Sequence, residues 1–341
     1  MTHAVAIAHP NVAFAKYWGK RARPGNFPAV PSLSVTLAGL STRTSVTFDG
    51  SLATDEITLG GAPASAADRE RVTLVLDRVR RASRETRRAR VESHNDFPTA
   101  SGLASSASGY AALALAASAA AKLEASDEVL SDLARRGSAS AARSIFGGWV
   151  ELLAGAEAGD EEDVLGARQV APEDQLDALV LVCVVTDAKK DASSRDGMAQ
   201  SARISPYWDA WLASAPKNFA EMKAALAARD LRRVGELGEA SALAMHALAM
   251  SAGVIYMRGM TIELMSRVRA LRADGAAAYA TSDAGPHVKV LVSSADALAV
   301  RAVLEAIPGV LRVIEARPGP AARIVEGSAA GGTSQKSTEV S

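Results

Sequence analysis

A run of small and hydroxyl-bearing residues, "PTASGLASSA", begins at Pro98 and leads into an alanine-rich segment that predicts a helix over residues 105–123. The first backbone N–H groups of a helix lack intrahelical partners and carry partial positive charge, and small side chains let them approach phosphate oxygens. Gly102 frees the backbone and Ser101 adds a donor, while Ser105 or Ser106 could also ligate magnesium. An ordinary Ser/Gly helix cap has the same composition, so these residues alone leave both interpretations open.

Composition excludes several classes of function. The 341 residues include 38 Lys+Arg and 38 Asp+Glu, and this balance predicts neither a nucleic-acid nor a membrane partner. We interpret the Arg-rich stretch from Arg78 to Arg90 as a solvated helix end and loop. The single cysteine, Cys183 in "ALVLVCVV", predicts a buried strand residue and no disulfide framework. With no signal peptide or apolar span expected, we predict a cytoplasmic protein.

The order of expected elements indicates an α+β protein with two domains joined near residue 186. Before that point the patterns predict helices over 66–81, 105–123 and 127–136, and strands near 4–9, 32–37, 42–48, 56–59, 89–94, 147–153 and 176–185. Beyond it they predict helices over 206–228, 231–250, 260–273 and 294–307, and strands over 276–282, 287–293 and 310–315. We therefore expect an N-terminal domain over 1–185, a C-terminal domain over 186–326 and a disordered tail over 327–341.

Six segments, taken together, identify a family. The run from Pro98 is not a Walker P-loop, and it resembles the phosphate-binding motif of the GHMP superfamily of small-molecule kinases. The segments occur in the order "HPNVAFAKYWGKR", "SLSVTL", "NDFPTASGLASSASGYAAL", "RRGSASAARSIFGGWVEL", "SSRDGM" and "TSDAGPHVKVL". Over residues 4–315 this order resembles the diphosphomevalonate decarboxylase family. The resemblance implies a two-domain GHMP fold with its active site in the inter-domain cleft, and a homodimer.

The resemblance also implies a reaction and three catalytic residues. ATP, with Mg²⁺, would phosphorylate the 3-hydroxyl of mevalonate 5-diphosphate, and loss of phosphate and CO₂ would give isopentenyl diphosphate. Asp283 matches the aspartate that takes the hydroxyl proton, although an Asp before Ala-Gly-Pro also forms turns. Lys16 matches a lysine beside that aspartate, where a cation keeps the carboxylate ionised. Arg143 matches the arginine that holds the substrate carboxylate.

Further residues match family binding positions. Asn11 matches an asparagine near the substrate carboxylate and hydroxyl, and Ser194 matches a serine near the transferring phosphate. The positions near the substrate diphosphate are Tyr17, Trp18, Lys20, Ser138, Ser140 and Arg195. The ATP phosphates are expected at Ser101, Gly102, Leu103, Ala104, Ser105 and Ser106, with Ser106 also expected at the metal.

Alternatives remain open. The same acid, lysine and arginine would serve a decarboxylase of mevalonate 5-phosphate, and the basic and hydroxyl set around Lys20 favours two phosphates without deciding the matter. A pure 3-kinase and a non-catalytic nucleotide-binding regulator are less consistent with Asp283, Lys16 and Arg143 together. The chain departs from the family at His287, where an asparagine is common, and at Ser282, where larger apolar residues are common. We interpret His287 as strand-edge structure.

Overall fold

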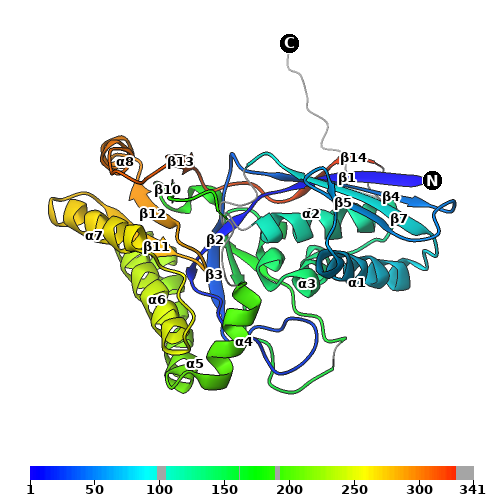
Figure 1. The fold of residues 1–341 in the computed structure, drawn as a ribbon, viewed down its shortest axis with the longest axis horizontal. Helices are drawn as coiled ribbons and strands as arrows, with labels where there is room; N and C mark the ends of the chain where they lie inside the picture. The colour runs from blue at the N-terminus through cyan, green and yellow to red at the C-terminus, as the bar shows by residue number, and fades with distance from the viewer. Residues whose placement is uncertain (98–104, 161, 189–192, 328–341) are drawn as a thin grey trace, which may run out of the picture.

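The computed structural model describes residues 1–97, 105–160, 162–188 and 193–327, which form three sheets and the helices that cover them. In Figure 1 one lobe carries β1, β4, β5, β7 and helices α1–α3, and the opposite lobe carries β10–β13 with α6–α8. Strands β2 and β3 lie between the two lobes. No described helix is long and apolar enough to cross a membrane.

The first lobe is a six-stranded sheet in the order β14-β1-β4-β7-β5-β6. Its strands are β1 (Thr2–Ala8), β4 (Thr42–Asp49), β5 (Glu56–Leu59), β6 (Ala62–Pro63), β7 (Arg88–Asn95) and β14 (Arg323–Glu326). Apolar side chains from one face pack against α1 (Ala66–Ser83), α2 (Ser105–Ala120) and α3 (Asp127–Gly137). Alanine dominates the buried side of α2, so this helix lies close to the sheet and presents its N-terminus near the middle of the molecule.

The central sheet has the order β2-β3-β8-β9, with β2 at Asn11–Ala15, β3 at Ser32–Thr36, β8 at Trp149–Leu152 and β9 at Arg168–Ala171. The third sheet has the order β11-β12-β10-β13, with β10 at Ala178–Val184, β11 at Ala278–Ser282, β12 at Val288–Ser293 and β13 at Arg312–Ala316. Helices α5 (Trp208–Ala227) and α6 (Leu231–Ser251) share one core with both sheets. Helices α7 (Gly259–Ala273) and α8 (Ala297–Glu305) cover the opposite face of the third sheet.

Most expected elements are present, and the differences have physical reasons. Cys183 is buried in β10, whose residues are all buried because both faces of the sheet are covered. The sequence did not predict β14, which returns from the end of the chain to pair with β1, because its short pattern gives no strong strand signal. It also did not predict β2, the 3-10 helices η1 (Ala139–Ile145) and η2 (Glu173–Gln175), β9, or α4 (Ser194–Ile204). The domain limits stay a prediction, and residues 328–341 of the expected tail lie outside the described residues.

Candidate active site

Lys16 and Asp283 meet between the lobes, each as the residue directly after a strand. Lys16 follows β2 and Asp283 follows β11, so sheet packing brings together residues 267 positions apart. Lys16 Nζ lies 2.7 Å from Asp283 Oδ1 and also donates to the Ala13 carbonyl at 2.7 Å. Lys16 is 2% exposed, whereas the Asp283 side chain is 31% exposed. The buried lysine therefore holds one oxygen of the carboxylate, while part of the Asp283 side chain stays exposed.

A second lysine, which the sequence reasoning missed, also contacts Asp283. Lys289 Nζ on β12 lies 3.0 Å from Asp283 Oδ2, and Lys289 is 2% exposed. Burial by itself disfavours the charged carboxylate, but the two lysines outweigh it and hold the pKa of Asp283 well below its usual range. Burial lowers the pKa of Lys16, and the Asp283 charge opposes that shift. A basic residue inside the apolar pattern "HVKVLV" was the available signal for Lys289.

Arg143 is held by neutral groups. It lies on η1, donates from Nη1 to Ser32 Oγ at 2.8 Å and from Nε to Ser34 Oγ at 2.9 Å, and is 2% exposed. Its Nη2 donates to Asn11 Oδ1 at 3.1 Å, and no described carboxylate forms an ion pair with it. Burial lowers the pKa of Arg143 to about 10, opposed by the charges of Asp283 and Tyr17. Because these bonds occupy only part of its five donors, the guanidinium can still bind an anion.

Asn11 orients the arginine. Its amide nitrogen donates to the Ser140 carbonyl at 3.0 Å and to Ser144 Oγ at 2.8 Å, so the amide oxygen is left to accept from Arg143. The start of β2 therefore fixes a side chain on η1, and both expected residues lie together. Asn11 is 3% exposed, so its amide acts mainly within the protein.

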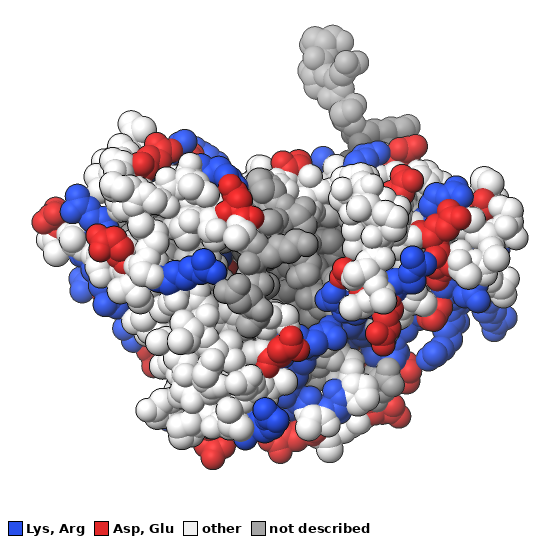
Figure 2. All heavy atoms as spheres, viewed as in Figure 1, with Lys and Arg blue, Asp and Glu red and all other residues white. Residues whose placement is uncertain are grey.

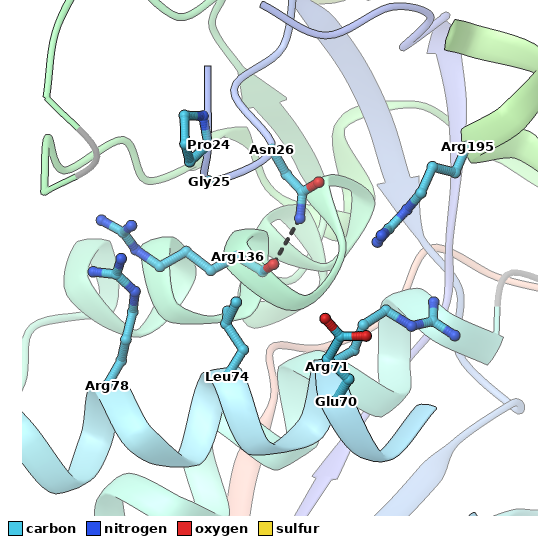
Figure 3. A pocket seen from close by; sticks show the side chains of 9 residues that line it. All are labelled: Pro24, Gly25, Asn26, Glu70, Arg71, Leu74, Arg78, Arg136 and Arg195. Carbon is cyan, nitrogen blue, oxygen red and sulfur yellow. Dashed lines mark hydrogen bonds between the residues drawn. The ribbon is translucent and has the colours of Figure 1, made fainter. Parts of the chain in front are cut away.

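A cavity of about 210 Å³ lies at the end of the site where the diphosphate positions were expected. Figure 3 shows Arg195 of α4 on one side of it and Arg71 of α1 on the other. Its lining is rich in arginine and comprises Pro24, Gly25, Asn26, Glu70, Arg71, Leu74, Arg78, Arg136 and Arg195. In the space-filling view, Lys and Arg side chains gather where the two lobes meet (Figure 2). Arg71, Arg78 and Arg136 form ion pairs with Asp68, Glu162 and Asp132, respectively. Arg195 has no ion pair among the described residues, so the cavity can still offer its charge to an anionic group.

Lys20 is held at this same end by Asn26, whose backbone has a left-handed conformation. Lys20 Nζ donates to Asn26 Oδ1 at 2.6 Å, and Asn26 Nδ2 donates to the Arg136 carbonyl at 2.6 Å, the dashed line of Figure 3. Asn26 has a φ of 59°, a conformation that asparagine tolerates better than most residues. Burial, with the charges of Arg195 and Arg71, lowers the pKa of Lys20 to about 8. Asn26 and Arg71 were not predicted, and the "PGN" turn was the signal for the former.

The other expected residues are two aromatic residues, Tyr17 and Trp18, and three serines. The Tyr17 hydroxyl is buried without a hydrogen-bond partner among the described residues, and burial raises the pKa of Tyr17 while Arg143 and Arg195 oppose the shift. Trp18 is 2% exposed, and its indole N–H donates to Ser201 Oγ at 3.1 Å, so this donor is engaged within the protein. The half-buried residues are Ser138 and Ser140, whose hydroxyls lie 3.2 Å apart, and Ser194 at the start of α4.

The expected phosphate loop is described only in part. Ser105 and Ser106 form the first turn of α2, which contains no acidic residue, whereas Ser101, Gly102, Leu103 and Ala104 lie outside the described residues. Within the described ranges, no group of three or more His, Cys, Asp and Glu side chains is placed to hold a metal ion. His287 is 1% exposed and accepts from the Val185 amide at 3.2 Å through Nδ1, as strand-edge structure would.

Comparison with known proteins decides the family. Residues 8–164 match the model of the diphosphomevalonate decarboxylase-like N-terminal domain, and residues 180–319 match that of the mevalonate 5-diphosphate decarboxylase C-terminal domain. The chain belongs to the diphosphomevalonate decarboxylase family. The family resemblance inferred from the six segments is therefore confirmed.

Relatives and solved structures agree with this family. A diphosphomevalonate decarboxylase of Aspergillus fumigatus is 34% identical over 90% of this chain and 80% of its own length. A phosphomevalonate decarboxylase of Haloferax volcanii is 33% identical over 84% of this chain and 87% of its own. The structure of MDDEF in complex with MVAPP, AMPPCP and magnesium has a TM-score of 0.87 at 37% identity, covering 95% of this chain and 99% of that one. The expected α+β fold is therefore confirmed.

Proposed function

We propose that the protein is an ATP-dependent diphosphomevalonate decarboxylase, which converts mevalonate 5-diphosphate to isopentenyl diphosphate, ADP, phosphate and CO₂. One observation carries the proposal. A carboxylate between two buried lysines, Asp283, lies in the same site as Arg143, a buried arginine with neutral partners. The relatives named above, and the complex of MDDEF with MVAPP and AMPPCP, support the substrate and the nucleotide.

The reaction end supplies a proton acceptor and an anion clamp. Lys16 and Lys289 keep Asp283 ionised, and Asp283 accepts the proton of the substrate 3-hydroxyl. As this proton leaves, the hydroxyl oxygen bonds to the γ-phosphorus of ATP, and ADP departs. The two lysines offset negative charge on the phosphoryl group in transit. Arg143, which Asn11 orients, holds the substrate carboxylate. When the C–C bond to this carboxylate breaks, CO₂ leaves and the electron pair of that bond forms the alkene. The phosphate departs with the electron pair of the C–O bond.

ATP and magnesium fit the residues that are described. The N-terminus of α2 carries no acidic side chain in its first turn, so its amides and the Ser106 hydroxyl suit the ATP phosphates. Ser101, Gly102, Leu103, Ala104 and Ser105 complete the proposed nucleotide set. Mg²⁺ commonly keeps several waters and binds substrate phosphates with few protein ligands, which agrees with the lack of a described carboxylate cluster. When bound, the ion would neutralise phosphate charge.

The opposite end supports two phosphates over one. Arg71 and Arg195 line the cavity, and their charges act on the nearby Lys20. Arg195 also acts on Tyr17, whose hydroxyl has no hydrogen-bond partner among the described residues. Each of these side chains is a donor suited to phosphate oxygens. Ser138, Ser140, Ser194 and Trp18 complete the proposed substrate site. Glu70 lines the cavity and Asp68 pairs with Arg71, so these donors favour two phosphates without requiring them.

A second candidate has a specific observation in its favour. The phosphomevalonate decarboxylase of Haloferax volcanii is almost as similar to this chain as the diphosphomevalonate decarboxylases are, so overall identity does not separate the two substrates. The test supplies ATP and magnesium with mevalonate 5-diphosphate or mevalonate 5-phosphate and follows CO₂. We expect kcat/KM for the diphosphate to exceed that for the monophosphate. The reverse preference would assign the chain to the second candidate.

Four further expectations stay proposals with their own tests. The homodimer implied by the resemblance predicts a doubled mass in sedimentation. Expression of the chain fused to a fluorescent reporter tests the cytoplasmic location. Limited proteolysis near residue 186 tests the division into domains at 1–185 and 186–326. We expect no nucleic-acid binding, which a shift assay checks.

A further inference from the structure

Lys289 occupies a position that the fold would ordinarily give to an apolar residue. In the antiparallel register of β12, Lys289 lies opposite Val182 of β10 and Thr281 of β11. Directly opposite residues share one face of a sheet, and Val182 belongs to the core that also includes Phe14 of β2. The lysine stem therefore extends across a buried face toward the end of β2, where Lys16 lies.

A buried cation is costly unless it is paired, and the described partner of Lys289 is Asp283. The two lysines divide the carboxylate, with Lys16 on Oδ1 at 2.7 Å and Lys289 on Oδ2 at 3.0 Å. Since both lysines are 2% exposed and the Asp283 side chain is 31% exposed, they restrain the group from within and leave its outer edge accessible.

We propose that Lys289 is a positioning residue for the reaction, which fixes the orientation of the Asp283 carboxylate, the proposed proton acceptor, through its contact with Oδ2. The proposal rests on the proposed function. Without Lys289 only the contact between Lys16 and Oδ1 would remain, and the carboxylate could rotate about it. Oδ2 would then no longer have a fixed position. Other groups that act on Asp283 are Lys16 directly after β2, Arg143 of η1 and His246 of α6. His246 stays neutral in the physiological range, because burial lowers its pKa to about 4.

The first experiment compares kcat and KM at neutral pH in the parent protein and three variants. Lys289→Met removes the cation and keeps most of the stem, Lys289→Arg keeps a cation, and Lys217→Met on the exposed side of α5 is the matched control. We expect kcat in Lys289→Met to fall by about tenfold or more with KM little changed, since misplacing a reacting group by about 1 Å can cost about 100-fold in rate. Lys289→Arg should restore much of the parent kcat, and Lys217→Met should match the parent. Equal kcat values for the parent and Lys289→Met would overturn the proposal.

The second experiment does not depend on the reaction. In protein with ¹³C-labelled aspartate carboxylates, the Asp283 signal is assigned by its loss in Asp283→Asn and titrated in each variant. We expect the pKa of Asp283 to be higher in Lys289→Met than in the parent, and an unchanged pKa would contradict the proposal. If Lys289→Met fails to fold, Lys289→Gln keeps an N–H donor without charge and takes its place. Absence of CO₂ release by the parent would refute the proposed function while this titration still tests the contact between Lys289 and Asp283.

Discussion

The two ends of the candidate site solve different electrostatic problems. At the reaction end, Lys16, Lys289, Arg143 and Asn11 are each 3% exposed or less, and described protein groups already fix each one. At the phosphate end, Lys20 and Arg71 are half-buried and Arg195 is exposed, and the cations face one another across a cavity. The first end is organised before any ligand arrives, whereas at the second Arg71 is paired with Asp68 and Arg195 has no ion pair among the described residues, so an anion can still bind there. Substitutions at the reaction end should therefore affect turnover, and those at the phosphate end should affect affinity.

The largest effect is expected at the proton acceptor. Asp283→Asn should lower kcat by about 1,000-fold, because general-base catalysis commonly contributes about 10² to 10⁴. ADP and CO₂ formation should fall together, which a coupled assay of both products measures. Asp274→Asn, at the exposed end of α7, is the matched control and should leave kcat unchanged. An Asp283→Asn variant with the parent kcat would contradict the view that the reaction end controls turnover.

Arg143 should follow as the next largest effect. Arg143→Gln should lower kcat/KM by about 100-fold, in line with the loss of about 1.5–3 kcal/mol for hydrogen bonds to a charged group. Arg143→Lys should not rescue the activity, because a point charge cannot replace the planar donors that Ser32, Ser34 and Asn11 align. Initial rates over a substrate series measure the effect. Full rescue by lysine would show that charge alone is required.

At the phosphate end, Arg195→Gln should act on affinity. We expect KM for mevalonate 5-diphosphate to rise by about fivefold with kcat little changed, since an exposed ion pair is worth up to about 1 kcal/mol. The ratio of kcat/KM for the diphosphate to that for the monophosphate should fall. Arg203→Gln, near the other end of α4, serves as the control. A loss confined to kcat would place Arg195 with the reaction end.

The smallest effect is a pH dependence at Lys20. Its pKa of about 8 means that the side chain is charged below that pH and loses its proton as the pH rises through it. KM for the diphosphate should therefore rise a few-fold between pH 7 and about 9, as one of several cations is lost. Lys20→Arg should keep KM nearly flat over this range, because arginine stays protonated. A rise of the same size in Lys20→Arg would assign the dependence to another group.

The sequence predicted more of the reaction end than of the phosphate end, for reasons visible in single residues. Asn11 begins β2, Lys16 follows β2 and Asp283 follows β11, so sheet packing brings these three together. Arg143 lies on η1 and reaches them through Asn11. Their roles stay predictions. Arg71 was missed because one arginine in an amphipathic, charge-rich helix looks like a solvated residue, and only the position of α1 beside the cavity gives it another meaning.

Lys289 shows a different limit of sequence reasoning. A lysine in a strand usually marks a solvent-facing position, and the pattern "VKVLV" is compatible with that reading. Its burial depends on β2 and α6 covering this face of the third sheet, which is a tertiary contact. The return of β14 to β1 was likewise missed, because long-range pairing of a four-residue strand leaves little trace in local sequence.

The most direct test of the account is a single-turnover experiment with excess protein over mevalonate 5-diphosphate, in the presence of ATP and magnesium. Rapid quenching would measure ADP and CO₂ from the same samples. The account predicts that both products accumulate to equal amounts, one of each per substrate molecule, since the acid, the lysines and the arginine serve one site. ADP formed without CO₂ would make the protein a 3-kinase and would contradict the role assigned to Arg143.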